Sequence, residues 1–205
     1  MAIRIKTQGN IENIKASMNK EEPQLTNQDN SYSALDFYFS NYYEPNKLKS
    51  FIKKCEHMIR SSEAYSKYIG DLRNNKELDR CAVLGNITDE DAEIEFHHYP
   101  FSLYDICNIV IMNRIIKKEN FTSFDICKEV LNLHSLNLVG LVPLCITEHQ
   151  LVHDGVRFIP LTSTFGKIKE FVDIYFEAID DNLIEKYNEL VEMTEKLEKE
   201  ESENE

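Results

Sequence analysis

Two short clusters of histidine constrain the fold of this chain more than any other feature of its sequence. His97 and His98 are adjacent, and His149 and His153 follow later with three residues between them. These clusters contain four of the six histidines in the 205-residue sequence. Residues four apart on a helix lie on one face, with Cβ atoms about 5–6 Å apart, a geometry that suits two ligands of one metal ion. The later pair is therefore predicted to bind a metal ion.

The earlier pair ends a segment with the alternation of a β-strand. In the run 92–97, successive side chains point to opposite faces of the strand. The alternation therefore allows one of the two histidines to face the metal ion while its neighbour has a different role, and Glu95 is expected to face solvent. We predict that residues 81–87 pair with this run as a β-hairpin, because the polar segment between them suits a turn.

The later pair lies on a predicted short helix, 148–154. The strand-like segment before it contains Pro143, which confines it to a sheet edge. Thr147 and the glutamine three residues later match a capping box, and Gly155 can adopt the left-handed conformation that ends a helix. Glu148, in the first turn, complements the helix dipole. A helix of about two turns is marginal alone, so tertiary packing or a metal ion must hold it.

These clusters and their neighbours resemble the HNH (ββα-metal) nuclease family. The matching segments are 94–101, with the sequence Ile-Glu-Phe-His-His-Tyr-Pro-Phe, and 140–153, which begins Gly-Leu-Val-Pro-Leu-Cys. In that family a His-His pair at a strand end is followed by a second strand and a short helix that carries the last histidines. The resemblance covers about residues 92–156. It implies an α+β fold with a ββα-metal (HNH-like) core.

The resemblance also assigns roles to the clustered histidines. It implies three metal ligands, His97, His149 and His153, and a general base, His98. A neutral imidazole, whose ordinary pKa is about 6.5, can take a proton from water while a metal ion neutralises charge on the phosphate. The implied cofactor is one divalent metal ion: zinc, magnesium, manganese or nickel. The implied function is that of a metal-dependent DNA endonuclease of bacteriophage type.

Three features of the sequence differ from that family. Gly140 stands where the family has an asparagine that braces the loop of the general base, and His134 and Asn137 lie near enough in sequence to replace it. The five cysteines include no Cys-x-x-Cys pair, and two extra helices are predicted between the histidine clusters. These differences leave an alternative open: a non-catalytic, metal-stapled structural or protein-interaction module in a larger assembly, such as a phage.

The charge distribution bears on the partners of the chain. The net charge is −13, of which residues 1–93 and 94–166 each contribute only −2 and residues 167–205 contribute −9. An acidic chain lacks the attraction that dominates DNA affinity, so composition does not favour the DNA partner that the resemblance implies. The amphipathic C-terminal segment has no strict heptad, so it suits packing on the parent domain as well as a protein partner or a homodimer. No apolar run approaches the ~18 residues of a membrane span, so a protein of the (host) cytoplasm without a membrane partner is expected.

The chain is predicted to divide into five segments. In order, these are a polar, poorly ordered segment 1–35, a helical region 36–78, the HNH-like core 79–160, a long amphipathic helix 161–198 and an acidic disordered tail 199–205. The core contains a helical insertion of about 101–135, in which two Ser/Thr-x-x-Asp motifs predict capped helix starts.

Overall fold

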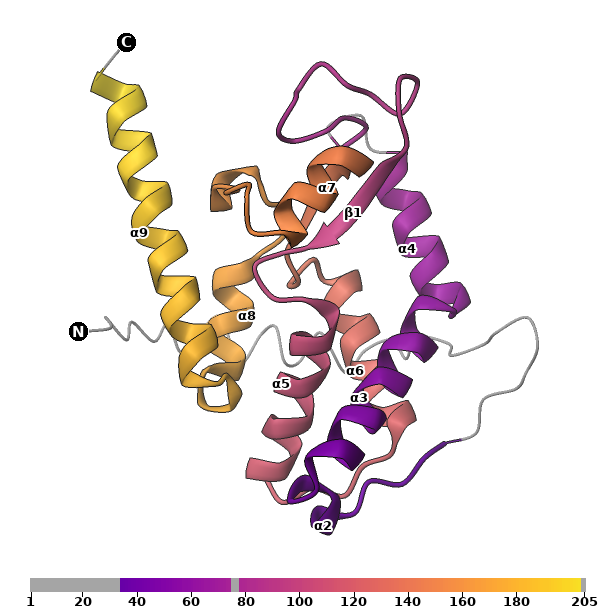
Figure 1. Ribbon diagram of the computed structural model, residues 1–205. Coiled ribbons are helices and arrows are strands. Elements are labelled where there is room, and N and C mark those ends of the chain that lie inside the picture. Colours follow the sequence, from indigo (N-terminus) through magenta and orange to yellow (C-terminus); the bar gives the residue numbers. More distant parts are fainter. Residues whose placement is uncertain (1–33, 75–77, 204–205) are drawn as a thin grey trace.

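The computed structural model of the chain describes residues 34–74 and 78–203. It is an α+β structure in which helices surround a small two-stranded antiparallel sheet (Figure 1). The elements are α2 (Phe39–Tyr42), α3 (Pro45–Arg60), α4 (Glu63–Arg73), β1 (Ile94–His98), α5 (Leu103–Ile116), α6 (Ser123–Ser135), β2 (Leu141–Cys145), α7 (Ile146–His153), α8 (Ile168–Tyr175) and α9 (Asp181–Glu203). Short 3₁₀ helices cover Leu161–Ser163 and Phe176–Ala178. The predicted segment 1–35 lies outside the described residues, apart from its last two positions.

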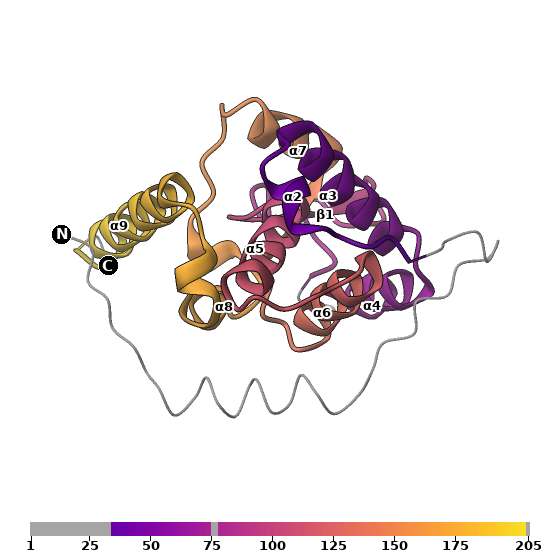
Figure 2. The same ribbon diagram turned by 90° about the horizontal axis from the view of Figure 1, so that it is seen from below.

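A helical layer built on α3, α5 and α6 forms the main core (Figure 2). Helix α5 contacts α3, α6 and α8, and it is apolar on nearly every side, as a helix surrounded by others must be. Its fully buried side chains include Ile106, Ile109 and Ile111. Burying one such aliphatic side chain stabilises a fold by about 1.5–3 kcal/mol, so this helix anchors the layer.

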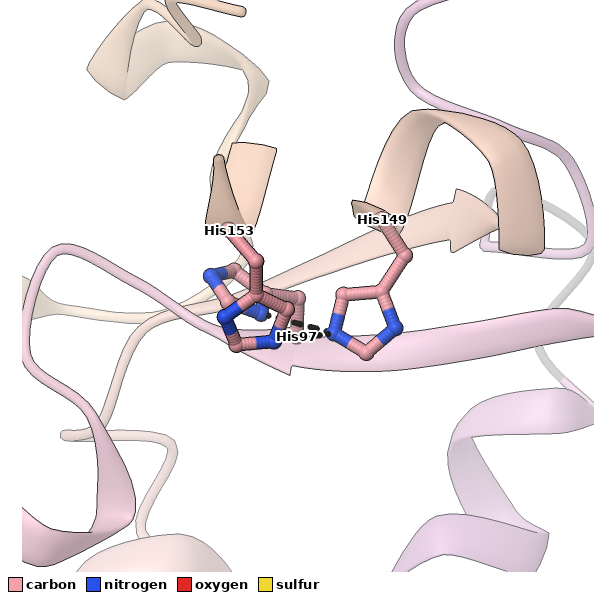
Figure 3. Close-up of side chains that lie close together, drawn as sticks. All are labelled: His97, His149 and His153. Carbon is pink, nitrogen blue, oxygen red and sulfur yellow. Dashed lines mark hydrogen bonds between the residues drawn. The ribbon is translucent and has the colours of Figure 1, made fainter. Parts of the chain in front are cut away.

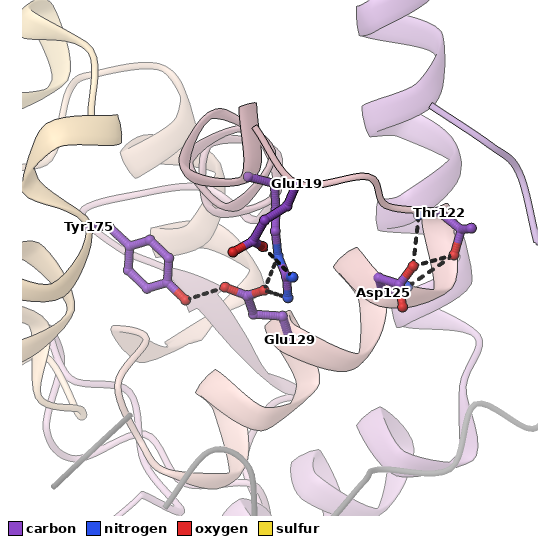
Figure 4. Close-up of polar contacts among 6 residues, drawn as sticks. Glu119, Thr122, Asp125, Glu129 and Tyr175 are labelled. Carbon is purple, nitrogen blue, oxygen red and sulfur yellow. Dashed lines mark hydrogen bonds and ion pairs between the residues drawn. The ribbon is translucent and has the colours of Figure 1, made fainter. Parts of the chain in front are cut away.

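The two helices of the insertion begin as their sequence motifs predict. The Ser102 hydroxyl accepts a hydrogen bond from the Asp105 backbone N–H at 3.2 Å, and the Asp105 carboxylate accepts one from the Ser102 N–H at 3.0 Å. Thr122 and Asp125 form the same reciprocal pair at the start of α6 (Figure 4). These capping boxes satisfy N–H groups that no helical carbonyl can reach, and they fix where α5 and α6 begin.

A polar network links helices α5, α6 and α8. Arg114, near the end of α5, donates to Glu129 on α6 at 2.8 Å and to Glu119 in the connecting loop at 2.7 Å (Figure 4). The Tyr175 hydroxyl on α8 donates to the other oxygen of the Glu129 carboxylate at 2.7 Å. Glu129 thereby links three helices through charge-assisted bonds, which are stronger than neutral ones.

Strand β1 pairs with β2 and not with the segment before it. The register runs from Ile94 opposite Cys145 to His98 opposite Leu141. The predicted hairpin with residues 81–87 is therefore wrong; that segment forms turns, with a positive φ at Gly85. All five side chains of β2 are buried, and Cys81 and Ala82 of the turn segment pack in the same apolar cluster as Val142 and Leu144 of β2.

The C-terminal region differs from the single long helix predicted for 161–198. The chain forms α8, turns after the 3₁₀ segment 176–178 and continues as α9 (Figure 1). Phe171 and Tyr175 on α8 are buried in the core, and Tyr187 on α9 lies with its ring centroid 6.0 Å from that of Phe101. The apolar faces of α8 and α9 therefore pack on the same core. A single straight helix could not bring both faces to it. Helix α9 extends to residue 203, so most of the predicted disordered tail is helical.

Within the described residues, every helix is too short or too polar to span a bilayer.

Candidate metal centre

Strand β1 and helix α7 bring together the three histidines predicted as metal ligands. His97 extends from β1, and His149 and His153 extend from one face of α7 (Figure 3). The Nδ1 atom of His97 lies 3.0 Å from Nε2 of His149, which lies 3.1 Å from Nε2 of His153. Each residue offers one donor nitrogen, and these atoms all lie within 4.8 Å of one another. We refer to this group as the histidine trio.

The spacing of the trio is close to that of ligands around one ion. Nitrogens bound to a tetrahedral zinc ion at 2.0–2.1 Å lie about 3.3 Å from each other. Nε2 of His149 lies near two other ring nitrogens at once. It has only one lone pair or one proton to offer, so hydrogen bonding satisfies the trio incompletely. A cation between the three nitrogens would accept a lone pair from each of them.

Burial favours the ligand form of His97. Its pKa is lowered to about 4, first by burial and then by the neighbouring His149 and His153 rings. A metal ion binds neutral imidazole, so this side chain needs to lose no proton at neutral pH before it can coordinate. His153 is exposed and His149 is partly buried, so the trio opens to solvent on the side of α7.

Helix α7 is stabilised partly by contacts with residues outside the helix. It starts at Ile146, two residues before the predicted start, and Cys145 occupies the N-cap without a side-chain cap hydrogen bond. The predicted Thr147 capping box therefore does not form. Glu148 is 4% exposed, and its carboxylate accepts hydrogen bonds from the Arg157 guanidinium at 2.8 and 3.2 Å. Gly155 has φ +69°, the left-handed conformation predicted for the stop.

The structure does not bring His98 to the trio. His98 lies on the opposite face of β1 and is 6% exposed, with Nε2 3.0 Å from Nε2 of His134 on α6. Nδ1 of His134 lies 2.7 Å from the carbonyl oxygen of Val130, which can only accept, so that nitrogen carries a proton. A neutral His134 then accepts at Nε2, and His98 must be the donor. The Nε2 atom of His98 is therefore committed to a hydrogen bond in the core.

The environment of this pair keeps both rings neutral. Burial lowers the pKa of His98 well below its ordinary value and that of His134 to about 4. The Tyr65 ring stacks on His98 and meets His134 edge-on, and Tyr68 covers His134 from another side. The pair joins the sheet to the helical layer. His134 thus contacts the predicted general base, whereas Asn137 accepts a hydrogen bond from the Tyr68 hydroxyl at 3.3 Å.

Gly140 is required by a close approach of two backbone segments. A Cβ atom at this position would lie 1.9 Å from the carbonyl oxygen of Tyr99 and 2.9 Å from Cγ1 of Ile168. The Tyr99 N–H donates to the Gly140 carbonyl at 3.0 Å, which holds the two segments together. No side chain, asparagine included, fits here unless the backbone moves.

Glu95 is the residue of the site that the sequence did not reveal. Its side chain is partly exposed to solvent, as expected, and its carboxylate also contacts Nδ1 of His149. The alternation of β1 places Glu95 on the same strand face as His97, two residues on. That alternation could have placed Glu95 beside the trio, although no local pattern indicates which helical side chain it would meet.

The fold and the trio define a small α+β protein in which three histidine side chains meet between a strand and a short helix. Comparison with known families assigns the chain more narrowly. It belongs to the Bacteriophage G278-like virion protein family, whose family model matches residues 1–205. No curated protein and no solved structure matches the chain. The phage origin implied by the HNH resemblance is thus confirmed, and the family is one of virion proteins, where the sequence suggested a protein of the host cytoplasm.

Proposed function

We propose that this protein is a structural component of the phage particle in which one divalent metal ion fastens α7 to β1. Three observations support the proposal: the family consists of virion proteins, the trio joins two separate elements, and His98 is turned into the core. The trio carries the proposal, because three imidazole nitrogens within 4.8 Å of one another are a donor set of a kind that holds transition metals in proteins.

The mechanical role of the ion follows from the size of α7. This helix has eight residues, and isolated helices of that length are unstable in water. An ion bound by His97 and by both helix histidines would attach α7 to the sheet by bonds that the unfolded chain cannot form. The free energy of metal binding would then become free energy of folding. In this proposal β1, β2 and α7 form a ββα-metal unit, with α5 and α6 inserted between the strands.

The donor set indicates which of the four predicted ions would bind. Imidazole is a ligand for zinc and nickel, whereas magnesium prefers oxygen ligands in octahedral geometry. Three nitrogen donors therefore favour zinc or nickel over magnesium and manganese. Zinc accommodates three protein ligands and one further ligand in a tetrahedral site.

DNA cleavage remains a second candidate, favoured by one observation. Three protein ligands leave a tetrahedral ion one open position, as in hydrolytic metal sites. Two other observations count against it. His98, the predicted base, is buried away from the trio, and the net charge of −13 opposes binding to a polyanion.

A metal assay tests the proposal. Purified protein, loaded with zinc and passed through a desalting column, should retain one zinc ion per chain by elemental analysis, and EDTA should lower its Tm. His149→Ala should lose the ion, whereas His57→Ala, which removes an exposed histidine on α3, should retain it. Wild-type protein without zinc and with an unchanged Tm in EDTA would refute the metal role. Plasmid nicking by the zinc-loaded protein would favour the nuclease instead.

A further inference from the structure

We propose that Glu95 is a positioning residue of the trio, which fixes the tautomer and the orientation of the His149 ring. The inference rests on the proposed metal site and adds a fourth residue to it. Glu95 would act through His149 and would not itself bind the ion.

The contacts of His149 assign a different task to each ring nitrogen. Nδ1 contacts the Glu95 carboxylate, and Nε2 lies 3.0 Å from His97 Nδ1 and 3.1 Å from His153 Nε2. An ionised carboxylate only accepts hydrogen bonds, so Nδ1 carries a proton, and in the neutral ring that metal binding requires it is the only one. Nε2 then presents its lone pair to the other two histidines. Glu95 thereby selects the one neutral tautomer that can coordinate an ion between the three rings.

The position of Glu95 excludes two simpler roles. It faces the ring nitrogen opposite the trio, so it is not part of the donor set while His149 keeps this orientation. A plain surface ion pair is the other alternative, since the side chains of Glu95 and His149 are 39% and 24% exposed. Such a pair would contribute little to stability and would leave metal affinity unchanged. Carboxylates that accept from metal-bound histidines do change it, by about 10- to 100-fold.

Zinc affinity provides the first test. Glu95→Ala removes the acceptor, and Glu93→Ala removes an exposed acidic side chain from the residues just before β1. With a competing chromophoric chelator, the zinc Kd of Glu95→Ala should rise by about 10- to 100-fold over wild type. The Glu93→Ala control should stay within about twofold, because it removes the same charge without touching His149. Equal affinities of the two variants would overturn the inference.

Histidine ring NMR provides a second test that needs no metal. In metal-free, ¹⁵N-labelled wild type, His149 should show the tautomer protonated at Nδ1. Glu95→Gln retains an acceptor oxygen and should retain that tautomer, whereas Glu95→Ala should shift the ring toward Nε2–H. If wild type binds no zinc, the proposed function fails, yet a tautomer that depends on Glu95 would still uphold this inference. The same tautomer in wild type, Glu95→Ala and Glu93→Ala would overturn it.

Discussion

The two faces of β1 give adjacent histidines opposite properties. His97 faces α7 beside two other imidazoles, on a side that opens to solvent. The hydrogen bonds among these three rings satisfy their nitrogens only in part. His98 faces the helical layer, where a single partner, His134, and two tyrosine rings enclose it. Both rings have a lowered pKa, yet only one remains free to bind a ligand. Burial alone therefore does not mark a functional histidine; the atoms that its nitrogens face decide the role.

Removal of the metal ion should produce the largest difference between the two faces. With free zinc at 1,000 times its Kd, binding would stabilise the folded state by about 4 kcal/mol. EDTA should abolish that contribution in wild type and have no effect on His153→Ala, which lacks an exposed ligand. Differential scanning calorimetry measures both shifts. A chelator effect of equal size in the two proteins would mean that the ion binds elsewhere.

Gly140 lies where the chain leaving β1 meets β2, so its substitution should disturb both faces together. Gly140→Ala places a Cβ atom 1.9 Å from the Tyr99 carbonyl oxygen, and the backbone must separate to admit it. We expect a loss of about 3 kcal/mol in unfolding free energy, the upper end of the usual cost of overpacking. Chemical denaturation measures the loss. Gly70→Ala is a matched control, because a Cβ there meets nothing within 4 Å.

Acid should destabilise the buried face through His98 and His134. Their lowered pKa values mean that the folded state resists protonation, so the neutral pair contributes its full stability above the ordinary pKa of about 6.5. That contribution is lost as the pH falls from there toward about 4, the pKa of His134. The lowering of the His134 pKa from about 6.5 to about 4 accounts for roughly 3 kcal/mol of this loss, and His98 adds to it.

Metal-free protein in EDTA isolates this effect from competition between protons and the ion. Urea denaturation between pH 7 and pH 4 should show a steeper decline for wild type than for the His98→Leu/His134→Leu double variant. Identical slopes would show that the two histidines take up protons at the same pH in the folded and unfolded states, so that their pKa values are not lowered by folding.

Substitution of His134 alone should separate the two faces most cleanly, with a smaller effect. His134→Leu leaves the Nε2–H donor of His98 buried without its acceptor, which costs about 1–3 kcal/mol. Zinc content should not change, because this pair lies across the strand from the trio. His153→Ala should do the reverse: it should lose zinc and change the metal-free stability by about 0.5 kcal/mol or less. Loss of zinc in His134→Leu would show that the faces are coupled.

Local periodicity accounts for the part of the site that the sequence predicted. Helical spacing places His149 and His153 on one face, and strand alternation separates His97 from His98. Neither pattern reveals which face of β1 is covered by α6, because His134 comes from a separate helix. The predicted partner of β1 was wrong for the same reason, because its true partner, β2, is distant in sequence and follows two inserted helices.

The fold was predictable where one segment carried its own signal. The capping motifs at Ser102 and Thr122 fixed two helix starts. The break between α8 and α9 was not predictable, because neither proline nor glycine marks it. Phe171 and Tyr187 both lie against Phe101, with ring centroids 5.8 and 6.0 Å from its own, and one straight helix would hold these two residues too far apart for that.

The insertion of α5 and α6 between β1 and β2 has a consequence for the order of assembly. His97 and His149 are separated in sequence by the whole insertion, so their encounter closes a long loop of chain. Closing such a loop is entropically costly until its interior has condensed, and contacts with large sequence separation form late. Metal uptake is therefore expected to follow the folding of the insertion, so that bound zinc would distinguish completed subunits from partly folded ones.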